Sequence, residues 1–333
     1  MRESPLPEQW LCLTGRVQYV QRVSAKEFSS SCPSCFGAPH SDGTWPDRCR
    51  LFTDAHPTLF CRRCGLVAYP DQFGDKNYAR PSPEQIGIWR AEQIKREEER
   101  KRSAERALQH LRDERTWELY HETMDAGARA YWCKRGIHED MQDFWNLGWK
   151  DVHYFRSGET SASSPTATIP LFDNQWQPLN IKHRIIVPPN KNDRYRYELA
   201  GQSHPLFLCD PGRPIGDDVI VVEGEIKAMV MFETLDDAKI SMVGLPGLSP
   251  DDEIVKQLAV CERVLLVLDP GSDVPVEQNG KKLISPAERL VERIGRKNCR
   301  LLIPTGGKID DIILAANMGK GDVRAMLRQA VPM

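Results

Sequence analysis

The apolar runs that most strongly predict secondary structure lie in the last third of the chain. Residues 219–222 read Val-Ile-Val-Val, and such an unbroken β-branched run predicts a strand buried on both faces of a parallel sheet. A helical pattern over 226–235 follows at once. Similar apolar runs predict three further strands at 239–243, 263–268 and 300–303. Strands that alternate with helices in this way predict an α/β domain.

Helix starts are marked by three capping signals. Ser82 opens a capping box with Gln85, and Ser285 opens another with Glu288. Ser249 followed by Pro250 predicts an N-cap and a first helical residue. The first signal begins a long predicted helix over 82–124, in which residues 92–106 are almost all charged. We interpret this helix as a solvated linker, because its interleaved acids cancel the field of its bases.

Acidic residues follow three of the predicted strands. Glu223 ends the first, Asp269 and Asp273 follow the third, and Asp310 and Asp311 follow the fourth. Ligands bind at the carboxyl ends of strands in open α/β sheets, so these carboxylates are expected at one edge. Oxygen ligands suit Mg²⁺ or Mn²⁺, and ions held in this way usually serve phosphoryl or nucleotidyl transfer. The alternative is a set of loop acids, with Glu223 capping its helix.

Two Cys-x-x-Cys pairs near the N-terminus have the spacing of a tetrahedral Zn²⁺ site. Cys32 and Cys35 are followed, after 25 intervening residues, by Cys61 and Cys64. Ten cysteines are many for a cytoplasmic chain, where disulfides are rare. Residues 50–53 and 58–60 alternate like the hairpin of a zinc ribbon. The alternatives are unmetallated thiols, or other ligands from inside the loop, namely His40, Cys49 and His56.

The most basic part of the chain lies between the charged helix and the parallel sheet. Gly136 predicts a helix stop with a basic rim of Arg129, Lys134 and Arg135. The alternative is a packed helix pair around Trp132 and Trp145. Beyond a loop predicted over 157–166, residues 168–173 and 178–184 predict a hairpin. Four cations in two alternating rows, Lys182 with Arg184 and Arg194 with Arg196, suit a polyphosphate or a nucleic-acid strand.

The global numbers set wide bounds. The chain has 333 residues, enough for two or three domains, and a formal net charge of −2, which argues against nucleic-acid binding by bulk charge alone. It has no apolar run of membrane-spanning length and no signal pattern, so a cytoplasmic protein is expected. A P-loop motif is absent, so no ATPase motor is expected within it.

The motif order resembles that of DnaG-type primases. Val-Ile-Val-Val-Glu-Gly-Glu at 219–225, Val-Gly-Leu-Pro-Gly at 243–247, Leu-Leu-Val-Leu-Asp at 265–269 and Lys-Ile-Asp-Asp at 308–311 are similar to the TOPRIM domain. The four paired cysteines match the ribbon of phage-like members. One departure is Gly271, where the family has a second aspartate, so that Asp273 would have to serve instead.

This resemblance implies a fold class and a domain order. The chain would be a multi-domain α/β protein, with a zinc ribbon over 1–80, a charged helical linker over 81–124, a mixed α+β basic part of the primase core over 125–215 and a TOPRIM sheet over 216–333. It would be a stand-alone primase of a phage, plasmid or integrated element, in the cytoplasm of a bacterial cell or a phage-infected host.

The resemblance also implies an activity. The chain would synthesise RNA primers on a single-stranded DNA template from ribonucleoside triphosphates, with a replicative helicase in trans. Structural Zn²⁺ would hold the ribbon, and Glu223, Asp269 and Asp311 would hold two catalytic Mg²⁺ or Mn²⁺ ions for two-metal nucleotidyl transfer. Asp273 and Asp310 would complete the catalytic acids, and Lys227 would join Arg184 and Arg196 as a phosphate contact. The alternatives are a TOPRIM nuclease and a degenerate accessory protein that binds single-stranded DNA or a helicase.

Overall fold

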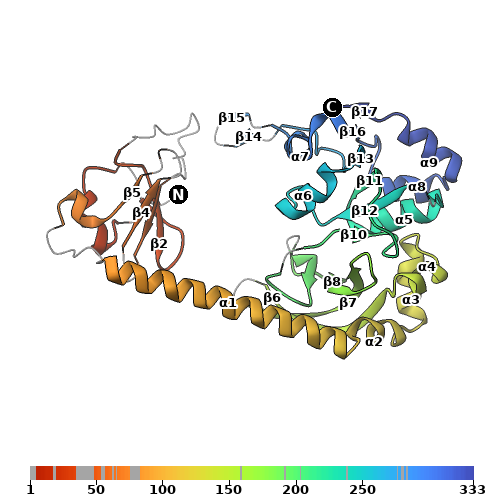
Figure 1. Ribbon diagram of the computed structural model, residues 1–333, viewed down its shortest axis with the longest axis horizontal. Helices are drawn as coiled ribbons and strands as arrows, with labels where there is room; N and C mark the ends of the chain where they lie inside the picture. Colours follow the sequence, from red (N-terminus) through yellow and green to blue (C-terminus); the bar gives the residue numbers. More distant parts are fainter. Residues whose placement is uncertain are drawn as a thin grey trace. The chain divides into compact units, whose positions relative to one another are not determined.

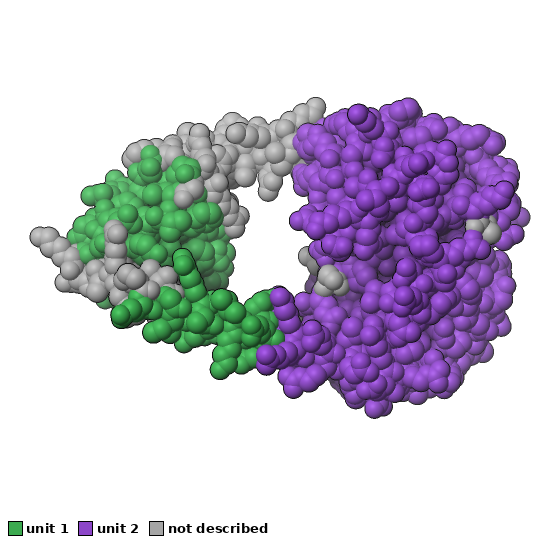
Figure 2. Space-filling model, viewed as in Figure 1, with its two compact units in different colours: residues 1–99, 277–283 green, residues 100–276, 284–333 purple. Residues whose placement is uncertain are grey.

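The computed structural model divides into two compact units (Figure 1, Figure 2). The N-terminal unit comprises residues 1–99 with 277–283, and the C-terminal unit comprises residues 100–276 with 284–333. The structure describes residues 5–17, 20–34, 49–53, 57–61, 64, 66–75, 83–157, 160–190, 193–202, 204–237, 239–275, 277–278, 281–282 and 284–333. The division expected at residues 80, 124 and 215 stays a prediction.

The N-terminal unit is built on a five-stranded antiparallel sheet. Its strands follow in chain order as β1 (Val20–Arg22), β2 (Glu27–Ser30), β3 (Cys49–Phe52), β4 (Leu59–Cys61) and β5 (Val67–Ala68). Two 3₁₀ helices flank the sheet, η1 (Glu8–Leu13) and η2 (Pro70–Phe73). Trp10 is fully buried, and its indole N–H donates to the Phe52 carbonyl at 2.9 Å. The predicted ribbon hairpin is confirmed as β3 paired with β4.

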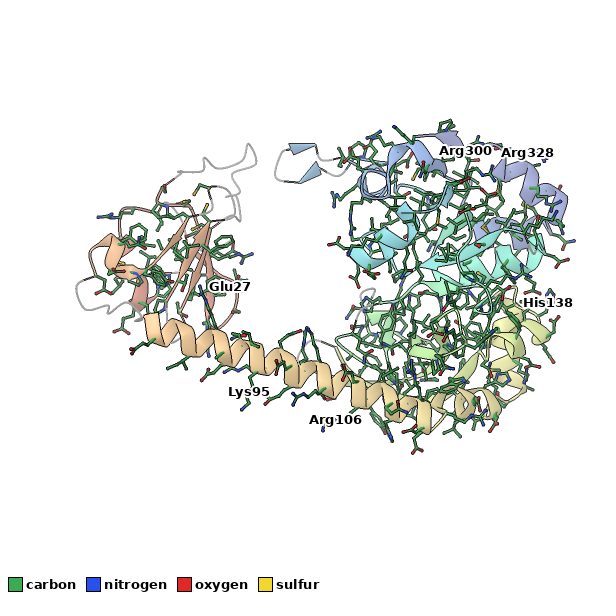
Figure 3. The ribbon with its side chains drawn as sticks, in the orientation of Figure 1. Glu27, Lys95, Arg106, His138, Arg300 and Arg328 are labelled. Carbon is green, nitrogen blue, oxygen red and sulfur yellow. The ribbon has the colours of Figure 1, made fainter. Side chains whose placement is uncertain are left out.

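The charged segment forms two helices rather than the single helix predicted over 82–124. Helix α1 (Pro83–Asp113) ends before Arg115, which takes a positive φ of 47° and precedes α2 (Thr116–Glu122). No Gly or Pro marks this break, so the sequence carried no signal for it. Lys95 and Arg106 project from α1 (Figure 3) and are exposed, as expected for a solvated helix. None of the described helices combines the length and apolar composition that a membrane span requires.

The next two helices surround the predicted glycine turn. Helix α3 (Ala126–Lys134) begins at Asp125, whose side chain accepts the Ala128 N–H at 2.7 Å. Helix α4 (Glu139–Phe144) follows Gly136, whose φ of 81° confirms the left-handed helix stop. Trp132 and Trp145 are buried in the main core of the C-terminal unit, so the interpretation of the tryptophans as packing residues is confirmed.

A four-stranded antiparallel sheet comes next, in the order β6 (Gly148–Ser157), β7 (Thr160–Phe172), β8 (Pro178–Ile185) and β9 (Tyr195–Tyr197). The hairpin predicted over 168–184 is confirmed as β7 paired with β8. The loop predicted over 157–166 is wrong, because residues 160–166 extend β7 along β6. The sequence predicted a loop here because the residues of this part of the strand are small and polar. Ser164 and Thr166 are buried there, where their hydroxyls have hydrogen-bond partners.

The C-terminal sheet has six strands in the order β10-β12-β11-β13-β16-β17, with the four central strands parallel (Figure 1). Their bounds are β10 (Phe207–Leu208), β11 (Asp218–Glu223), β12 (Ser241–Leu245), β13 (Arg263–Val267), β16 (Cys299–Leu302) and β17 (Val331–Pro332). All four predicted strands are therefore confirmed. A separate ribbon pairs β14 (Glu277–Gln278) with β15 (Lys281–Lys282), and the short helix η4 (Arg296–Asn298) precedes β16.

Helices cover both faces of this sheet, as the alternation within β11 requires. Ile220 and Val222 share a hydrophobic cluster with α5 (Glu225–Leu235), α8 (Ile309–Ala315) and α9 (Lys320–Leu327). Val219 and Val221 share the other cluster with α6 (Asp252–Ala259) and α7 (Pro286–Ile294).

Of the two capping predictions in this region, one is confirmed and the other is wrong. The Ser285–Glu288 capping box is confirmed at the start of α7. Helix α6, by contrast, begins at Asp252 with Asp251 as its N-cap, not at Ser249 and Pro250. Asp251 has the extended backbone of an N-cap, but its side chain makes no capping hydrogen bond.

The first testable prediction concerns Gly148, at the start of β6. A Cβ there would lie 2.7 Å from the backbone of Tyr120 in α2, so the backbone itself would have to move. We expect Gly148→Ala to lower the free energy of unfolding by about 1–3 kcal/mol, measured by urea denaturation. Gly321→Ala in α9 is the matched control, because nothing lies within 4 Å of its Cβ position and Ala favours helix. Equal stability of Gly148→Ala and the wild type would contradict this close packing.

Candidate functional site

The carboxyl ends of the parallel strands open into a pocket of about 320 Å³ in the C-terminal unit. Acidic and basic side chains line it together. The acids are Glu223, Glu225, Asp269, Asp310 and Asp311, and the bases are Arg135, Lys182, Arg184, Arg194, Lys227 and Lys308. The pocket therefore brings together all but one of the five predicted catalytic acids, and five of the eight predicted phosphate-binding cations.

The acidic wall is shaped by tight backbone turns. Glu223 ends β11, and the N–H of Asp269, just past β13, donates to its Oε2 at 3.1 Å. Gly224 takes a φ of 96°, which lets the chain turn sharply from β11 into α5. Gly244 of β12 packs against this turn, since a Cβ there would lie 3.0 Å from the Cα of Glu225. The strand ends thus hold the carboxylates on rigid elements.

Two of these carboxylates are bound by cations. Asp269 forms an ion pair with Lys227 through Oδ1, and Lys308 Nζ lies 3.5 Å from its Oδ2. Arg135 donates to Asp310 Oδ2 at 3.2 Å. Asp310 Oδ1 is buried and has no hydrogen-bond partner among the described residues. Such an orphaned oxygen is suited to a ligand or a water that the pocket would take up.

A third acid, Glu225, forms a fully buried ion pair with Lys182. Their side chains are 3% and 5% exposed, and Lys182 Nζ lies 2.5 Å from Glu225 Oε1. The ammonium also lies 4.5 Å from the centre of the Tyr195 ring. Burial lowers the pKa of Lys182, but the Glu225 carboxylate and the tyrosines Tyr197 and Tyr195 raise it further, so the pKa lies above its usual value. The pair links β8 of the four-stranded sheet to α5 of the parallel sheet.

The basic wall comes from β8 and β9. Arg184 donates to the Tyr195 hydroxyl at 2.7 Å, and it shares the pocket-facing side of β8 with Lys182. Arg194, just before β9, is exposed and also lines the pocket. Arg196 lies on the other face of the sheet, because the register pairs it with His183. There it binds Asp193 and lies over the Phe155 ring.

Three further predicted site residues lie outside the pocket lining. Arg129 donates to Asp143 at 2.8 Å, and Lys134 is exposed at the end of α3. Asp273 is exposed in the loop that follows Gly271, whose φ is 89°. The end of β13 therefore contributes one carboxylate to the pocket, that of Asp269.

The oxygen donors of the pocket fit a divalent ion in chemical type. Glu223 and Asp311 form no ion pair within the described residues, so their carboxylates are available as ligands. The pocket acids do not converge tightly. Of the described residues, the groups of three ligand atoms that all lie within 4.8 Å of one another are found elsewhere.

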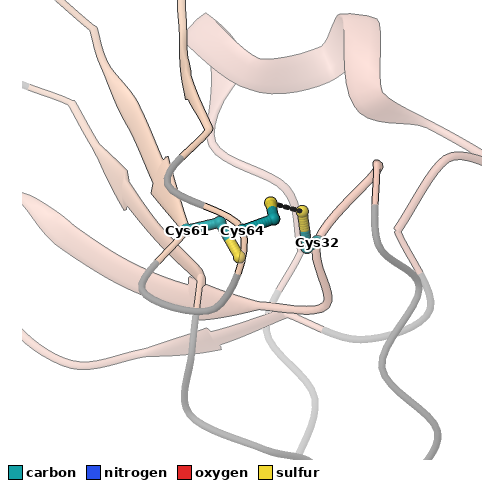
Figure 4. Close-up of side chains that lie close together, drawn as sticks. All are labelled: Cys32, Cys61 and Cys64. Atoms are coloured by element: carbon teal, nitrogen blue, oxygen red, sulfur yellow. Dashed lines mark hydrogen bonds between the residues drawn. The ribbon is translucent and has the colours of Figure 1, made fainter.

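One of those groups is the predicted zinc site of the N-terminal unit. The sulfur atoms of Cys32, Cys61 and Cys64 lie within 4.8 Å of one another, and Cys32 Sγ is 3.8 Å from Cys64 Sγ (Figure 4). Tetrahedral zinc with Zn–S bonds of about 2.3 Å requires sulfur separations of about 3.8 Å. The three thiols therefore fit zinc.

The fourth predicted ligand, Cys35, lies outside the described residues, as do the alternatives His40 and His56. Cys49, the remaining alternative, is buried opposite Cys61 in the sheet but is not a member of the group. Burial raises the pKa of the Cys49 thiol to about 12, which favours the protonated form.

The other group was missed by the sequence analysis. His153, His183 and Glu198 form it on the face of the four-stranded sheet opposite the basic wall. His183 Nε2 lies 2.6 Å from Glu198, and its Nδ1 lies 3.0 Å from the Thr166 hydroxyl. The two imidazole rings stack at 4.1 Å. In stacked imidazole rings the nitrogen lone pairs lie in nearly parallel planes and do not converge on one metal ion. We therefore interpret the group as a hydrogen-bonded network. The three residues come from three strands, and no local spacing reveals them.

This network shifts two pKa values. Burial, followed by the neighbouring His183 and Lys150, lowers the pKa of His153 to about 4. Burial raises the pKa of Glu198, but the hydrogen bond from His183 and the charges around it outweigh burial and lower the pKa to about 2. Both shifts make the folded state bind fewer protons than the unfolded chain.

Comparison with known proteins finds likeness in fold but not in sequence. No protein-family model matches this chain, and no curated protein matches it by sequence. A DnaG primase catalytic domain bound to single-stranded DNA superposes with a TM-score of 0.52, at 15% identity, over 69% of this chain and 83% of that one. A DnaG catalytic core gives 0.51, at 16% identity, over 68% and 80%. The resemblance to DnaG-type primases is thus confirmed at the level of the fold.

The second prediction tests the buried ion pair. Lys182→Met should lower the free energy of unfolding by about 3–5 kcal/mol, because it leaves the Glu225 carboxylate buried without a partner. Replacing both residues, as Lys182→Met with Glu225→Leu, should restore most of the loss in urea denaturation. Arg293→Ala is the control at the surface pair with Asp252 and should cost about 1 kcal/mol or less. A double variant as unstable as the single one would contradict this account.

The third prediction concerns acid stability. The pKa of His153 is about 4 when folded and about 6.5 when unfolded, so the unfolded chain binds the extra proton between these values and stability falls as pH falls. We expect the free energy of unfolding to drop by about 2 kcal/mol from pH 7 to pH 5 through this group. Glu198 contributes its loss only below about pH 4.5.

Replacing His153 separates this contribution from others. His153→Phe keeps a stacked ring but should lose the drop between pH 7 and pH 5 in urea denaturation. His110→Gln, at an exposed position of α1, should keep it. An unchanged pH dependence in His153→Phe would show that other groups cause the drop.

Proposed function

We propose that this chain is a primase-type nucleotidyltransferase that synthesises short RNA primers on single-stranded DNA, starting from the fold that it shares with DnaG catalytic cores. The observation that carries the proposal is the pocket itself. Carboxylates from three strand ends form one wall, and the cations of β8 and β9 form the other. A nucleoside triphosphate needs both, since its phosphates require cations and its reacting centre requires a metal-binding wall.

The carboxylates Glu223, Asp269 and Asp311 are the proposed ligands of Mg²⁺ or Mn²⁺, with Asp310 beside them. A divalent ion bound there would favour the deprotonated 3′-hydroxyl of the primer and neutralise charge as pyrophosphate leaves. An alternative role that we propose for Glu223 is to accept the hydroxyl proton, which is supported by the lack of a cation partner for its carboxylate among the described residues. Asp273, exposed outside the pocket lining, would take part only if its loop rearranged.

The basic wall supplies the proposed contacts to phosphate. Arg184 and Arg194 line the pocket from β8 and from just before β9, whereas the acids come from the parallel sheet and its helices. Lys182 and Arg135 are bound to Glu225 and Asp310, so their proposed role is to position the two walls. Arg129 and Lys134 lie on α3 outside the pocket lining, and we assign them to the template backbone. Arg196, bound to Asp193 on the other face of the sheet, would contact the template only if it left that partner.

The zinc site of the N-terminal unit is proposed to be structural. Closed thiolate sites hold a fold rather than take part in chemistry. The ribbon would then present a surface to the template, as the resemblance to primases implies. A replicative helicase acting in trans, and an origin in a phage or other mobile element, belong to the same proposal.

The fourth prediction tests the activity directly. The wild type with Mg²⁺ or Mn²⁺ and labelled ribonucleotides should form short products de novo on mixed-sequence single-stranded DNA. Glu223→Gln and Asp269→Asn should each reduce the yield by about 100-fold or more, because each removes a charged ligand at the reacting centre. Asp252→Asn, at a surface ion pair of α6, should retain full activity.

The same experiment separates the alternatives. A nuclease would shorten the template instead of extending a primer. An accessory protein would bind the template and change its mobility without making a product. Either result, with the variants folded, would overturn the primase proposal.

A further inference from the structure

Lys227 is a cation built into the acidic wall. It lies in the first turn of α5, one turn beyond Glu223, and its ammonium binds Asp269 Oδ1. Its side chain is only 12% exposed. The chain therefore places a positive charge between the ends of two adjacent parallel strands, β11 and β13, where their carboxylates would share a bound ion.

The backbone fixes the course of this side chain. A Cβ at Gly224 would lie 3.3 Å from Lys227 Cε, so the lysine passes closely over that glycine on its way to Asp269. The positive φ of Gly224 and the absence of a side chain there leave this path open. The lysine side chain therefore lies along the turn between β11 and α5, where a side chain at position 224 would crowd it.

The two oxygens of Asp269 are not equivalent. Oδ1 binds the mostly buried Lys227, whereas Oδ2 faces Lys308 at 3.5 Å, and the Lys308 side chain is 51% exposed. An exposed ion pair at this distance contributes little and can open readily. Oδ2 can therefore become a metal ligand, together with Glu223 or Asp311, while Oδ1 stays bound to Lys227.

The balance of charges in the whole pocket also limits how strongly it can bind divalent ions. Five carboxylates line it against six cationic side chains. Two of the acids, Glu225 and Asp310, are already bound to Lys182 and Arg135. The pocket thus has no excess of negative charge to hold two divalent ions close together.

We infer that Lys227 takes the place of one divalent ion, so that the pocket holds a single ion and the lysine supplies the second positive charge. A partly buried ammonium repels a divalent ion on the same carboxylate oxygen. This inference rests on the metal-dependent function proposed above. Its consequence is that Lys227 lowers the affinity of the pocket for divalent ions, rather than contacting phosphate as the sequence had suggested.

The fifth prediction measures Mn²⁺ binding to the full, zinc-loaded chain by isothermal titration calorimetry, without nucleotide or DNA. The wild type should bind one ion that Glu223→Gln loses. Lys227→Met should bind Mn²⁺ about tenfold more tightly or take up a second ion, since a nearby positive charge is removed. Lys308→Met should change the affinity by about threefold or less, because its ammonium is exposed.

Two results would overturn the inference. One is a wild-type pocket that binds two ions, and the other is a Lys227→Met variant that binds Mn²⁺ as the wild type does. Lys227→Gln is a second neutral variant in case the methionine disturbs folding, and it should show the same gain. Because no nucleotide is present, a gain in Mn²⁺ affinity would support the inference even if no primer were made.

Discussion

Carboxylates gathered at the ends of parallel strands repel one another, and the C-terminal unit is organised around the cations that offset this repulsion. Its own α5 provides Lys227, the loop before α8 provides Lys308, α3 leads into Arg135 and β8 provides Lys182. Two of these cations come from outside the parallel sheet. The same ion pairs therefore neutralise the site and join the four-stranded sheet and the helical turn to it.

The double use of β8 shows how this joining is achieved. Lys182 and Arg184 face the pocket, while His183 between them faces the buried network with Glu198 and Thr166. Because side chains alternate along a strand, fixing one face fixes the other. The network therefore holds the register that presents the two cations to the acids. The His183 side chain is fully buried, so a slip in register would leave its two bound nitrogens without partners.

The features that could be predicted from the sequence are those with a short-range pattern. Strand β11 could be predicted from its run of β-branched residues. The acids of the pocket could be predicted from their positions directly after predicted strands. The strand over 160–166 was missed because its small hydroxyl-bearing residues resemble a loop, whereas in the fold the Thr166 hydroxyl is bound to His183 of β8 and the Ser164 hydroxyl to the backbone of Pro165 and Val187. The break at Arg115 carries no Gly or Pro, and the His153 network joins residues from three strands. Such features depend on tertiary contacts, which local composition does not encode.

The contact that Lys227 makes could not be predicted from the sequence either, because it too depends on the tertiary structure. In the sequence, Lys227 lies one helical turn beyond Glu223, and this position predicted a contact to phosphate. In the fold its nearest partner is a carboxylate from another strand, reached across Gly224. The loop after Asp269 adds no further acid to the pocket, since Asp273 is exposed outside its lining. The pocket therefore has one acid fewer than the sequence predicted, and one of its cations, Lys227, binds an acid of the pocket itself. Both differences lower the net negative charge of the pocket. In the single-ion site that we infer, both differences would reduce the need for a second divalent ion at the end of β13, where Lys227 already binds Asp269.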